Sequence, residues 1–427
     1  MTLAILGGEP TITVPHPHNP LTAVSPADSD AIIRYLRAAD ADFEDMTVLR
    51  ELEEMLASFH GRRYCLLTNS GTSALHSAYF GLGLRPGDEV IAPTHTFPAT
   101  VTALFSAGAT PVLADCEVDT GNIDPGDVAA KITKRTKAVV VTHQWGHPVE
   151  MDALLRTARR HGLRVIEDAS LAVGATYRGR RTGSFGDAAA LSLSASKLIG
   201  GGVGGALLTN DRDVIDRALL LGQFSRSGND LHLDGYRPYA TTGYGHNYRI
   251  HVLAAVVAKA RLERINDLIA RRHARLGLLS ELLREQDVVS PPVTRPYVHR
   301  GQWGGYIALY EPDRAKGVSL ATFGRALVAE GLEVSPGGYH PLLHRTAVFS
   351  QPPSEYQASL HAAPLRRYRE GDFPQAEHHA DRQIGMPTFL GEPDELIEGY
   401  ARAFVKVAHA IDELRQVTAV EGPAPSA

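Results

Sequence analysis

Cysteine is scarce in this chain, and positive charge is nowhere concentrated. Only two cysteines, Cys65 and Cys116, occur among 427 residues, and neither has the spacing of a CxxC or a Cys/His motif. We therefore expect no disulfide framework and no metal site, but buried thiols typical of a reducing compartment. The formal net charge is −5 without any basic tract, so nucleic acid is not an expected partner.

Signals for export and for membrane insertion are also missing. The first ten residues, MTLAILGGEP, contain no basic segment and break at Gly7–Gly8, which argues against a secretory signal. The most apolar long stretch, 188–208, contains Lys197 and five glycines, which argues against a membrane span. We expect a cytoplasmic protein without a membrane partner. Its content of 44% hydrophobic and 21% charged residues is ordinary for a globular enzyme.

The most informative feature that is present surrounds Lys197. An apolar run, Leu163–Ile166, ends in two acids, the second of which is Asp168. This pattern is typical of a buried parallel strand whose carboxyl end meets a ligand. A second apolar run, 188–193, leads to Lys197 among serines and glycines. A lysine without acidic neighbours can lower its pKa and offer a free amine for Schiff-base chemistry.

Asp168 and Lys197 together suggest the cofactor pyridoxal 5′-phosphate (PLP). A carboxylate can pair with the pyridinium nitrogen and keep it protonated, which makes the ring an electron sink. Glycines let the backbone approach a bulky ligand, and hydroxyl groups can hold its phosphate. Either residue alone is more often structural, but their order in the chain favours the cofactor.

A candidate phosphate site lies in residues 64–84. The strand YCLLT turns through Asn69–Ser70–Gly71 into a helix that starts at Thr72. Exposed N–H groups at a helix N-terminus, a glycine and hydroxyls form a phosphate cradle. Serine and threonine are also ordinary N-caps, so this motif indicates a phosphate site only in combination with Lys197.

Strands and helices alternate from residue 64 to residue 208, which predicts an α/β fold with a doubly wound, mainly parallel sheet. We expect an irregular segment at 223–250, a long helix at roughly 251–285 and a smaller C-terminal α+β domain. The predicted division is 1–255, an N-terminal arm (1–28) and the large PLP-binding domain, and 256–427, a linker helix and the small domain with a disordered tail.

Several polar and aromatic residues are expected at the carboxyl ends of the strands, where ligands bind in such sheets. His95 is a candidate substrate contact, although a polar loop histidine is the simpler interpretation. His143, Gln144 and Trp145 end another strand and are further candidates. Phe97 would, from its surroundings alone, be a core residue beneath a helix.

The motifs around Asp168 and Lys197 resemble a known family. VIEDASLAVGA and SLSASKLIGGGVGGALLTND are similar to segments of the DegT/DnrJ/EryC1/StrS family of sugar and cyclitol aminotransferases, which are fold-type I PLP enzymes. The resemblance extends from LAILGGEP to FPQAEHHADRQIGMPTF. It implies a PLP-dependent transferase in which Lys197 binds the cofactor covalently and carries the proton, and Asp168 protonates the pyridine nitrogen. It also implies an N-terminal arm near the mouth of the active site.

The same resemblance assigns the remaining cofactor and substrate residues. Phe97 would stack on the pyridine ring, and the phosphate would be held by Gly71, Thr72, Ser73 and Ser192. GHNYR resembles a G-x-N-x-R element in which Asn247 reaches the phosphate of the partner subunit, with Arg249 nearby. This implies a homodimer with shared active sites. Residues 335–349 resemble a substrate loop, and its candidates, each equally interpretable as a surface residue, are Tyr339, His340 and His344.

Three positions depart from the family pattern, each by an apolar replacement of a polar group. They are Leu171, Leu198 and Val203. The loss of one buried hydrogen bond costs about 0.5–1.5 kcal/mol, so we expect cofactor binding to survive. The departures leave the substrate, and the fate of the carbanion, open.

The sequence therefore predicts a PLP-dependent aminotransferase. It would move an amino group from glutamate or glutamine to a keto sugar or keto cyclitol in amino-sugar or antibiotic biosynthesis, and the LAILGGEP opening favours a cyclitol slightly. The alternative is a PLP enzyme that catalyses elimination or epimerisation. A cofactor-binding protein without catalysis is disfavoured because both Lys197 and Asp168 are present.

Overall fold

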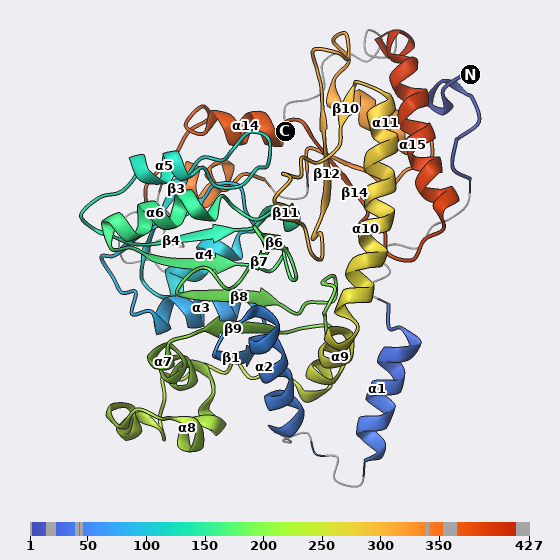
Figure 1. The fold of residues 1–427 in the computed structure, drawn as a ribbon. Coiled ribbons are helices and arrows are strands. Elements are labelled where there is room, and N and C mark those ends of the chain that lie inside the picture. The colour runs from blue at the N-terminus through green and yellow to red at the C-terminus, as the bar shows by residue number, and fades with distance from the viewer. Residues whose placement is uncertain are drawn as a thin grey trace.

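A computed structural model describes residues 2–13, 23–38, 42, 46–338, 341–352 and 365–415. Its centre is a seven-stranded sheet in the order β1-β9-β8-β5-β4-β2-β3 (Figure 1). The strands are β1 (Tyr64–Thr68), β2 (Glu89–Pro93), β3 (Thr110–Ala114), β4 (Thr136–Thr142), β5 (Arg164–Asp168), β8 (Ala188–Ser192) and β9 (Gly205–Thr209). Only β9 runs antiparallel to its neighbours. The predicted α/β fold with a mainly parallel sheet is confirmed.

Helices cover both faces of this sheet, which explains why its strands are nearly continuous apolar runs. One face packs against α3 (Gly71–Gly81), α4 (Ala99–Ser106) and α7 (Arg212–Gly222). The other packs against α2 (Met46–His60), α5 (Pro125–Ala130), α6 (Met151–His161) and α9 (Val252–Glu263). Parallel strands that alternate with helices bring β2, β4, β5 and β8 to one edge with their carboxyl ends.

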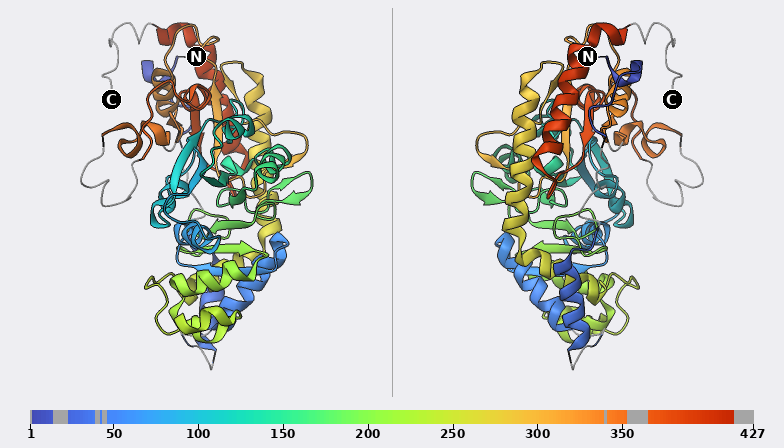
Figure 2. Two further views of the ribbon diagram at one scale, coloured as in Figure 1. Left: turned by 90° about the vertical axis from the view of Figure 1, so that its left-hand side faces the viewer. Right: turned by 90° about the vertical axis from the view of Figure 1, so that its right-hand side faces the viewer.

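A second sheet is built from the C-terminal part of the chain. It has the order β10-β12-β14-β13, with β10 (Val289–Ser290), β12 (Tyr306–Tyr310), β13 (Ser335–Pro336) and β14 (Gln383–Met386). It shares a core with α11 (Leu320–Ala329) and α15 (Asp394–His409). Helix α10 (Ile265–Leu282) runs past both sheets (Figure 2). The division after residue 255 stays a prediction.

Short elements complete the described chain. They are η1 (Ala4–Leu6), α1 (Pro26–Arg37), η2 (Gln144–Gly146), β6 (Thr176–Tyr177), β7 (Arg180–Arg181), η4 (Leu283–Glu285), β11 (Val298–His299), η5 (Leu343–Arg345), α12 (Ala347–Ser350) and α14 (Pro374–Ala380). Strands β11, β6 and β7 form a small third sheet. Within the described ranges, no helix is both long enough and apolar enough to cross a membrane.

Two predicted elements differ in the structure. The expected long helix breaks at Arg264, between α9 and α10, where Arg261 and Arg264 both bind Asp28 at 2.8 and 2.9 Å. The expected irregular segment contains α8 (Phe224–Asp230) and η3 (Asp234–Tyr239). Helix α8 is fixed by Arg226, which binds Glu53 on α2 at 2.7 Å. At both places the observed structure is held by ion pairs between residues far apart in the sequence.

The N-terminal arm also differs from expectation in its described part. Residues 2–13 pack against α11 and α15, where Leu3 and Ile12 join the core of the small domain, and none of them lines the predicted site (Figure 1). The backbone N–H groups of Ala4 and Thr11 donate to the Glu330 carboxylate at 2.8 and 3.0 Å. This buried carboxylate fixes the arm. The predicted disordered tail lies outside the described residues.

Candidate active site

A cavity of about 380 Å³ opens at the carboxyl edge of the large sheet. It brings together residues from the ends of β1, β2, β4, β5 and β8. The predicted residues that line it are Gly71, Thr72, His95, Phe97, Gln144, Trp145, Asp168, Leu171, Ser192, Lys197 and Val203. Residues separated by more than a hundred positions thus share one site.

Asp168 ends β5 with its carboxylate held by two donors. Thr100 Oγ1 donates to Oδ2 at 2.7 Å, and the Ser170 N–H donates to Oδ1 at 3.1 Å. Thr96 Oγ1 lies 2.7 Å from Thr142 Oγ1 and 3.0 Å from Thr100 Oγ1. Three buried hydroxyls therefore form a network that orients Asp168. Thr100, on the first turn of α4, is not predicted from the sequence, because it lies 68 positions away from the carboxylate that it contacts.

Lys197 follows β8 and reaches the same cavity. Burial of the amine lowers the pKa of Lys197 to about 8, an effect opposed by the Asp168 carboxylate and reinforced by the Arg272 guanidinium. The glycines after Lys197 are needed for close packing, since a Cβ on Gly205 would lie 2.2 Å from the Ser70 carbonyl oxygen. The chain thus brings the lysine loop against the start of α3.

The predicted phosphate cradle lies at the N-terminus of α3. Ser70 is its N-cap and accepts from the Ser73 N–H at 3.0 Å. Gly71 packs so closely on Ser192 that a Cβ would lie 3.1 Å from the Ser192 Cβ. Gly71, Thr72 and Ser192 line the cavity, whereas Ser73 Oγ donates to Asn69 Oδ1 at 2.7 Å. This donor set fits a phosphate group, and Ser73 supports the loop instead of facing the cavity.

Phe97 and His95 lie on the loop between β2 and α4. Phe97 is 51% exposed and lines the cavity, so it is not the core residue that its surroundings alone suggested. The buried His95 donates from Nδ1 to the Gly121 carbonyl oxygen at 3.0 Å, and its Nε2 accepts from Gln383 at 3.1 Å. The His95 ring is therefore fixed by protein partners at both nitrogens.

His143 does not reach the cavity, contrary to the prediction that it contacts substrate. Its Nε2 lies 3.0 Å from Glu167 Oε2, and its Nδ1 accepts from the Val149 N–H at 3.1 Å. Both side chains are completely buried. A side chain alternates direction along a strand, and His143 leaves β4 on the side of Glu167. The neighbouring Gln144 and Trp145 line the cavity instead.

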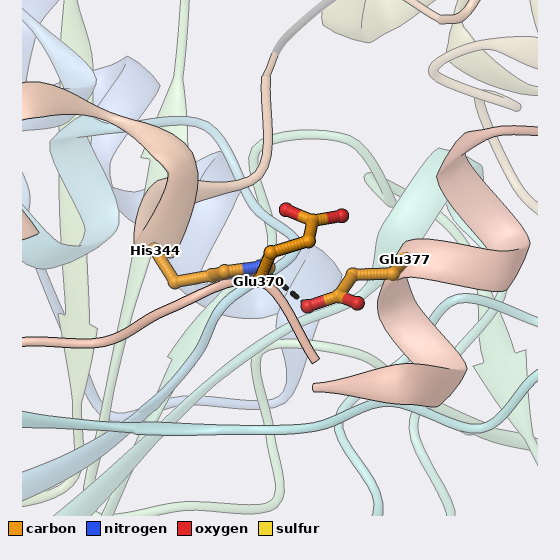
Figure 3. Close-up of side chains that lie close together, drawn as sticks. All are labelled: His344, Glu370 and Glu377. Carbon is orange, nitrogen blue, oxygen red and sulfur yellow. Dashed lines mark hydrogen bonds and ion pairs between the residues drawn. The ribbon is translucent and has the colours of Figure 1, made fainter. Parts of the chain in front are cut away.

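His344 also lies away from the cavity, where it contacts the start of the loop that contains Phe97. Its Nδ1 bonds Thr94 Oγ1 at 2.8 Å and its Nε2 bonds Glu377 at 2.9 Å. Glu370 completes a trio whose ligand atoms lie within 4.8 Å of one another (Figure 3). Within this trio a hydrogen bond joins His344 and Glu377, whereas Glu370 pairs with Arg345. Tyr339 and His340 lie outside the described residues.

Asn247 and Arg249 lie on the surface beside the phosphate cradle. The Asn69 amide donates to the Asn247 carbonyl oxygen at 3.1 Å, and Arg249 Nε donates to Asn247 Oδ1 at 3.1 Å. Neither side chain lines the cavity of its own chain. Their predicted role toward a partner subunit is not visible in one chain.

The three departures from the family pattern have different positions. Leu171 and Val203 line the cavity, whereas Leu198 is completely buried. The Leu198 N–H donates to Gln302 Oε1 at 3.3 Å, and Gln302 Nε2 donates to the Ser170 carbonyl oxygen at 2.8 Å. Gln302, which the sequence analysis missed, thus joins the lysine loop to the Asp168 loop.

Comparisons with known proteins agree with this geometry. The model of the DegT/DnrJ/EryC1/StrS aminotransferase family matches residues 41–391. An L-glutamine:2-deoxy-scyllo-inosose aminotransferase of Streptoalloteichus tenebrarius is 33% identical over 97% of this chain and 99% of its own. A GDP-perosamine synthase of Caulobacter vibrioides is 40% identical over 58% of this chain and 64% of its own. A crystal structure of DesI in the presence of its TDP-sugar product superimposes with a TM-score of 0.79, at 30% identity and 98% coverage of both chains. The chain belongs to the DegT/DnrJ/EryC1/StrS aminotransferase family.

Proposed function

We propose that this protein is a PLP-dependent aminotransferase that transfers an amino group from glutamine or glutamate to a cyclic ketone, either a keto sugar or a keto cyclitol. The observation that carries the proposal is the convergence of Lys197, Asp168 and the α3 N-terminus on one cavity. The relatives' names supply the substrate class, since one is an L-glutamine:2-deoxy-scyllo-inosose aminotransferase and another is a GDP-perosamine synthase.

The cavity residues have distinct roles toward the cofactor. Bound PLP supplies an electron sink for the carbanion at the amino-bearing carbon. Asp168, oriented by Thr100 and Ser170, holds a proton on the pyridine nitrogen. Gly71, Thr72 and Ser192 bind the phosphate through N–H and hydroxyl donors. Phe97 packs against the ring plane.

Lys197 carries the proton during the reaction. A pKa of about 8 leaves part of the lysine population neutral at physiological pH, and this neutral amine can both attack a carbonyl and accept a proton. The matching of its pKa to the working pH is the property expected of a general base. Burial within the cavity wall also keeps bulk water from the transferred proton.

The active form is proposed to be a homodimer. Residues 246–249 lie beside the cradle, where Asn69 N–H donates to the Tyr248 carbonyl oxygen at 2.7 Å. The segment that contains them is rich in exposed aromatic side chains, Phe224, Tyr239 and Tyr244. Such a surface is suited to a partner subunit, toward which Asn247 would be directed. We also propose a cytoplasmic location, in keeping with two free thiols.

A product assay tests the proposed reaction. Purified protein with PLP is incubated with L-glutamine and 2-keto-myo-inositol or a nucleotide-linked 4-keto sugar, and the aminated ring is identified by mass spectrometry. Amination of the ring with stoichiometric consumption of the amino donor is expected. Loss of water from the ring, or inversion without amination, would favour elimination or epimerisation, the alternative that the apolar Leu171 and Val203 motivate.

A further inference from the structure

The backbone of Trp145, in the cavity wall, lies in the left-handed region. Its φ and ψ are 51° and 26°, and the next residue, Gly146, has a φ of 87°. A bulky residue with positive φ is a genuine outlier, and such strain costs on the order of 1–3 kcal/mol. Strain of this kind persists only where the surrounding structure imposes it, and it concentrates at functional sites.

Arg300 holds the Trp145 peptide through a hydrogen bond to its carbonyl oxygen. Its Nη1 donates to the Trp145 carbonyl oxygen at 3.1 Å, and its Nε donates to Thr294 Oγ1 at 2.7 Å. A third bond goes to the Val293 carbonyl oxygen. Arg300 is only 3% exposed, and burial lowers its pKa to about 9. A buried cation is thus used to hold the peptide of Trp145.

Two adjacent glycines, directly before β12, allow the second sheet to pack closely against the cavity wall that contains Trp145. A Cβ on Gly305 would lie 2.3 Å from Trp145 Cε3 and 2.9 Å from Cζ3, and a Cβ on Gly304 would lie 2.7 Å from the Leu171 Cα. The Gly304 N–H donates to the Leu171 carbonyl oxygen at 3.0 Å. The six-membered part of the indole therefore packs directly against the backbone of Gly305. Any side chain at position 305 would clash with this ring. Trp145 has a fixed orientation at the cavity.

The chemistry of this wall suits one kind of ligand. Trp145, Leu171, Phe97 and Val203 contribute apolar surface to a cavity that is also lined by serine and threonine hydroxyls. A saturated ring of a polyol has hydroxyls at its rim and a face of C–H bonds. The negative π-face of an indole attracts such weakly positive C–H groups, whereas an acyclic keto acid offers no comparable face.

We propose that Trp145 determines the specificity for the amino acceptor by receiving the C–H face of a six-membered ketone ring. This inference rests on the proposed aminotransferase function and deepens it, because it concerns only the acceptor. The amino donor is acyclic and does not use the indole. Arg300 and Gly305 are positioning residues that act through Trp145.

A comparison of two half-reactions tests the proposal. Trp145→Ala is expected to raise the KM for 2-keto-myo-inositol about tenfold, the upper range of an aromatic contact. The half-reaction with L-glutamate, and the KM in the reverse direction for 2-oxoglutarate, the keto acid that glutamate leaves, should stay unchanged. Trp145→Phe should recover most of the loss. Equal changes for the ring and for 2-oxoglutarate would overturn the proposal, because they would indicate a structural role.

A fluorescence titration tests it independently of turnover. The chain has two tryptophans, so Trp303→Phe leaves Trp145 as the only indole emitter in the PLP-loaded protein. Saturable quenching by 2-keto-myo-inositol, absent with 2-oxoglutarate and weakened by Gly305→Ala, is expected. The absence of quenching at millimolar ring concentration would overturn the inference. Failure of both L-glutamine and L-glutamate to react with the wild-type protein would contradict the proposed function instead, and this titration would still decide the role of Trp145.

Discussion

The two sides of the cavity are built in different ways. Asp168 and Lys197 are positioned by strand ends and by contacts with neighbouring loops. Trp145 is held by Arg300, a residue 155 positions away, and by the missing side chain of Gly305. The side that we assign to the cofactor is thus held mainly by strand ends and loops of the large sheet, and the side that we assign to the acceptor is held by the segment that leads into the second sheet. Substitutions on the acceptor side are therefore expected to change the substrate without disturbing the residues that we assign to the cofactor.

The largest expected effect is on the cofactor side. Lys197→Ala should lower the aminotransferase rate by roughly a thousandfold or more, because it removes both the covalent attachment point and the general base. The rate is measured with L-glutamine and an acceptor. Lys259→Ala is the matched control, since Lys259 forms a surface ion pair with Glu263. A similar loss in both variants would contradict the assignment.

An effect on stability is expected at Glu167, which precedes Asp168 on β5. Glu167 is completely buried and accepts from the N–H groups of Gly183, Phe185 and Gly186 at 2.7, 2.7 and 2.8 Å. Glu167→Ala should lower the free energy of unfolding by about 3–5 kcal/mol, since it leaves Arg62 buried without its partner. Urea unfolding measures the change, and a loss below about 1 kcal/mol would contradict this account.

The same carboxylate gives a pH dependence with a definite sign. Hydrogen bonds from His143 and the charge of Arg62 lower the pKa of Glu167 below 4.5, despite the opposing and largest effect of burial. The stabilisation is therefore present above pH 4.5 and is lost as the pH falls below that value. Wild-type unfolding free energy should fall more steeply with acid than that of Glu167→Gln.

A smaller effect is expected from the hydroxyl that orients Asp168. Thr100→Val removes one hydrogen bond to a carboxylate, worth about 1.5–3 kcal/mol, and should lower the rate by about 10- to 100-fold with little change in acceptor KM. Thr102→Val, on the same helix but with a half-buried side chain outside the network, is the control. Equal effects would show that the change acts through α4 as a whole.

The titration of Lys197 should be sensitive to Arg272. With a pKa near 8, lowered from 10.5, the amine should be labelled by an acylating reagent in cofactor-free protein about tenfold faster at pH 9 than at pH 7, with a plateau above. Arg272→Met removes a positive charge and should move the midpoint upward. Arg271→Met removes an exposed charge on the next residue and should leave the midpoint in place.

The smallest expected effect concerns Leu171. Leu171→Gln adds a polar group to the cavity wall without changing Trp145 or Lys197. One hydrogen bond is worth about 0.5–1.5 kcal/mol, so the rate should change less than about tenfold. A larger change, or a change of product, would show that Leu171 selects the reaction.

The contrast between the two sides also explains what the sequence could predict. The fold follows from alternating apolar runs, and Asp168, Lys197 and Gly71 are predicted as site residues because each belongs to a short motif. Thr100, Gln302 and the Arg300–Trp145 bond were not identified, since their partners lie in other segments. His143 was placed on the wrong side because a strand end does not reveal which way a side chain points until its register is known. The break at Arg264 coincides with an ion pair to Asp28, more than 200 residues away, which the sequence pattern does not reveal.

The most direct test of the central claim is the absorption spectrum of PLP-loaded protein before and after addition of L-glutamine, with Lys197→Ala alongside. We expect a band at roughly 410–430 nm that depends on Lys197 and moves to about 330 nm with the donor, as the cofactor takes up the amino group. A wild-type band that stays in place with both L-glutamine and L-glutamate, or a band that Lys197→Ala retains unchanged, would contradict the account.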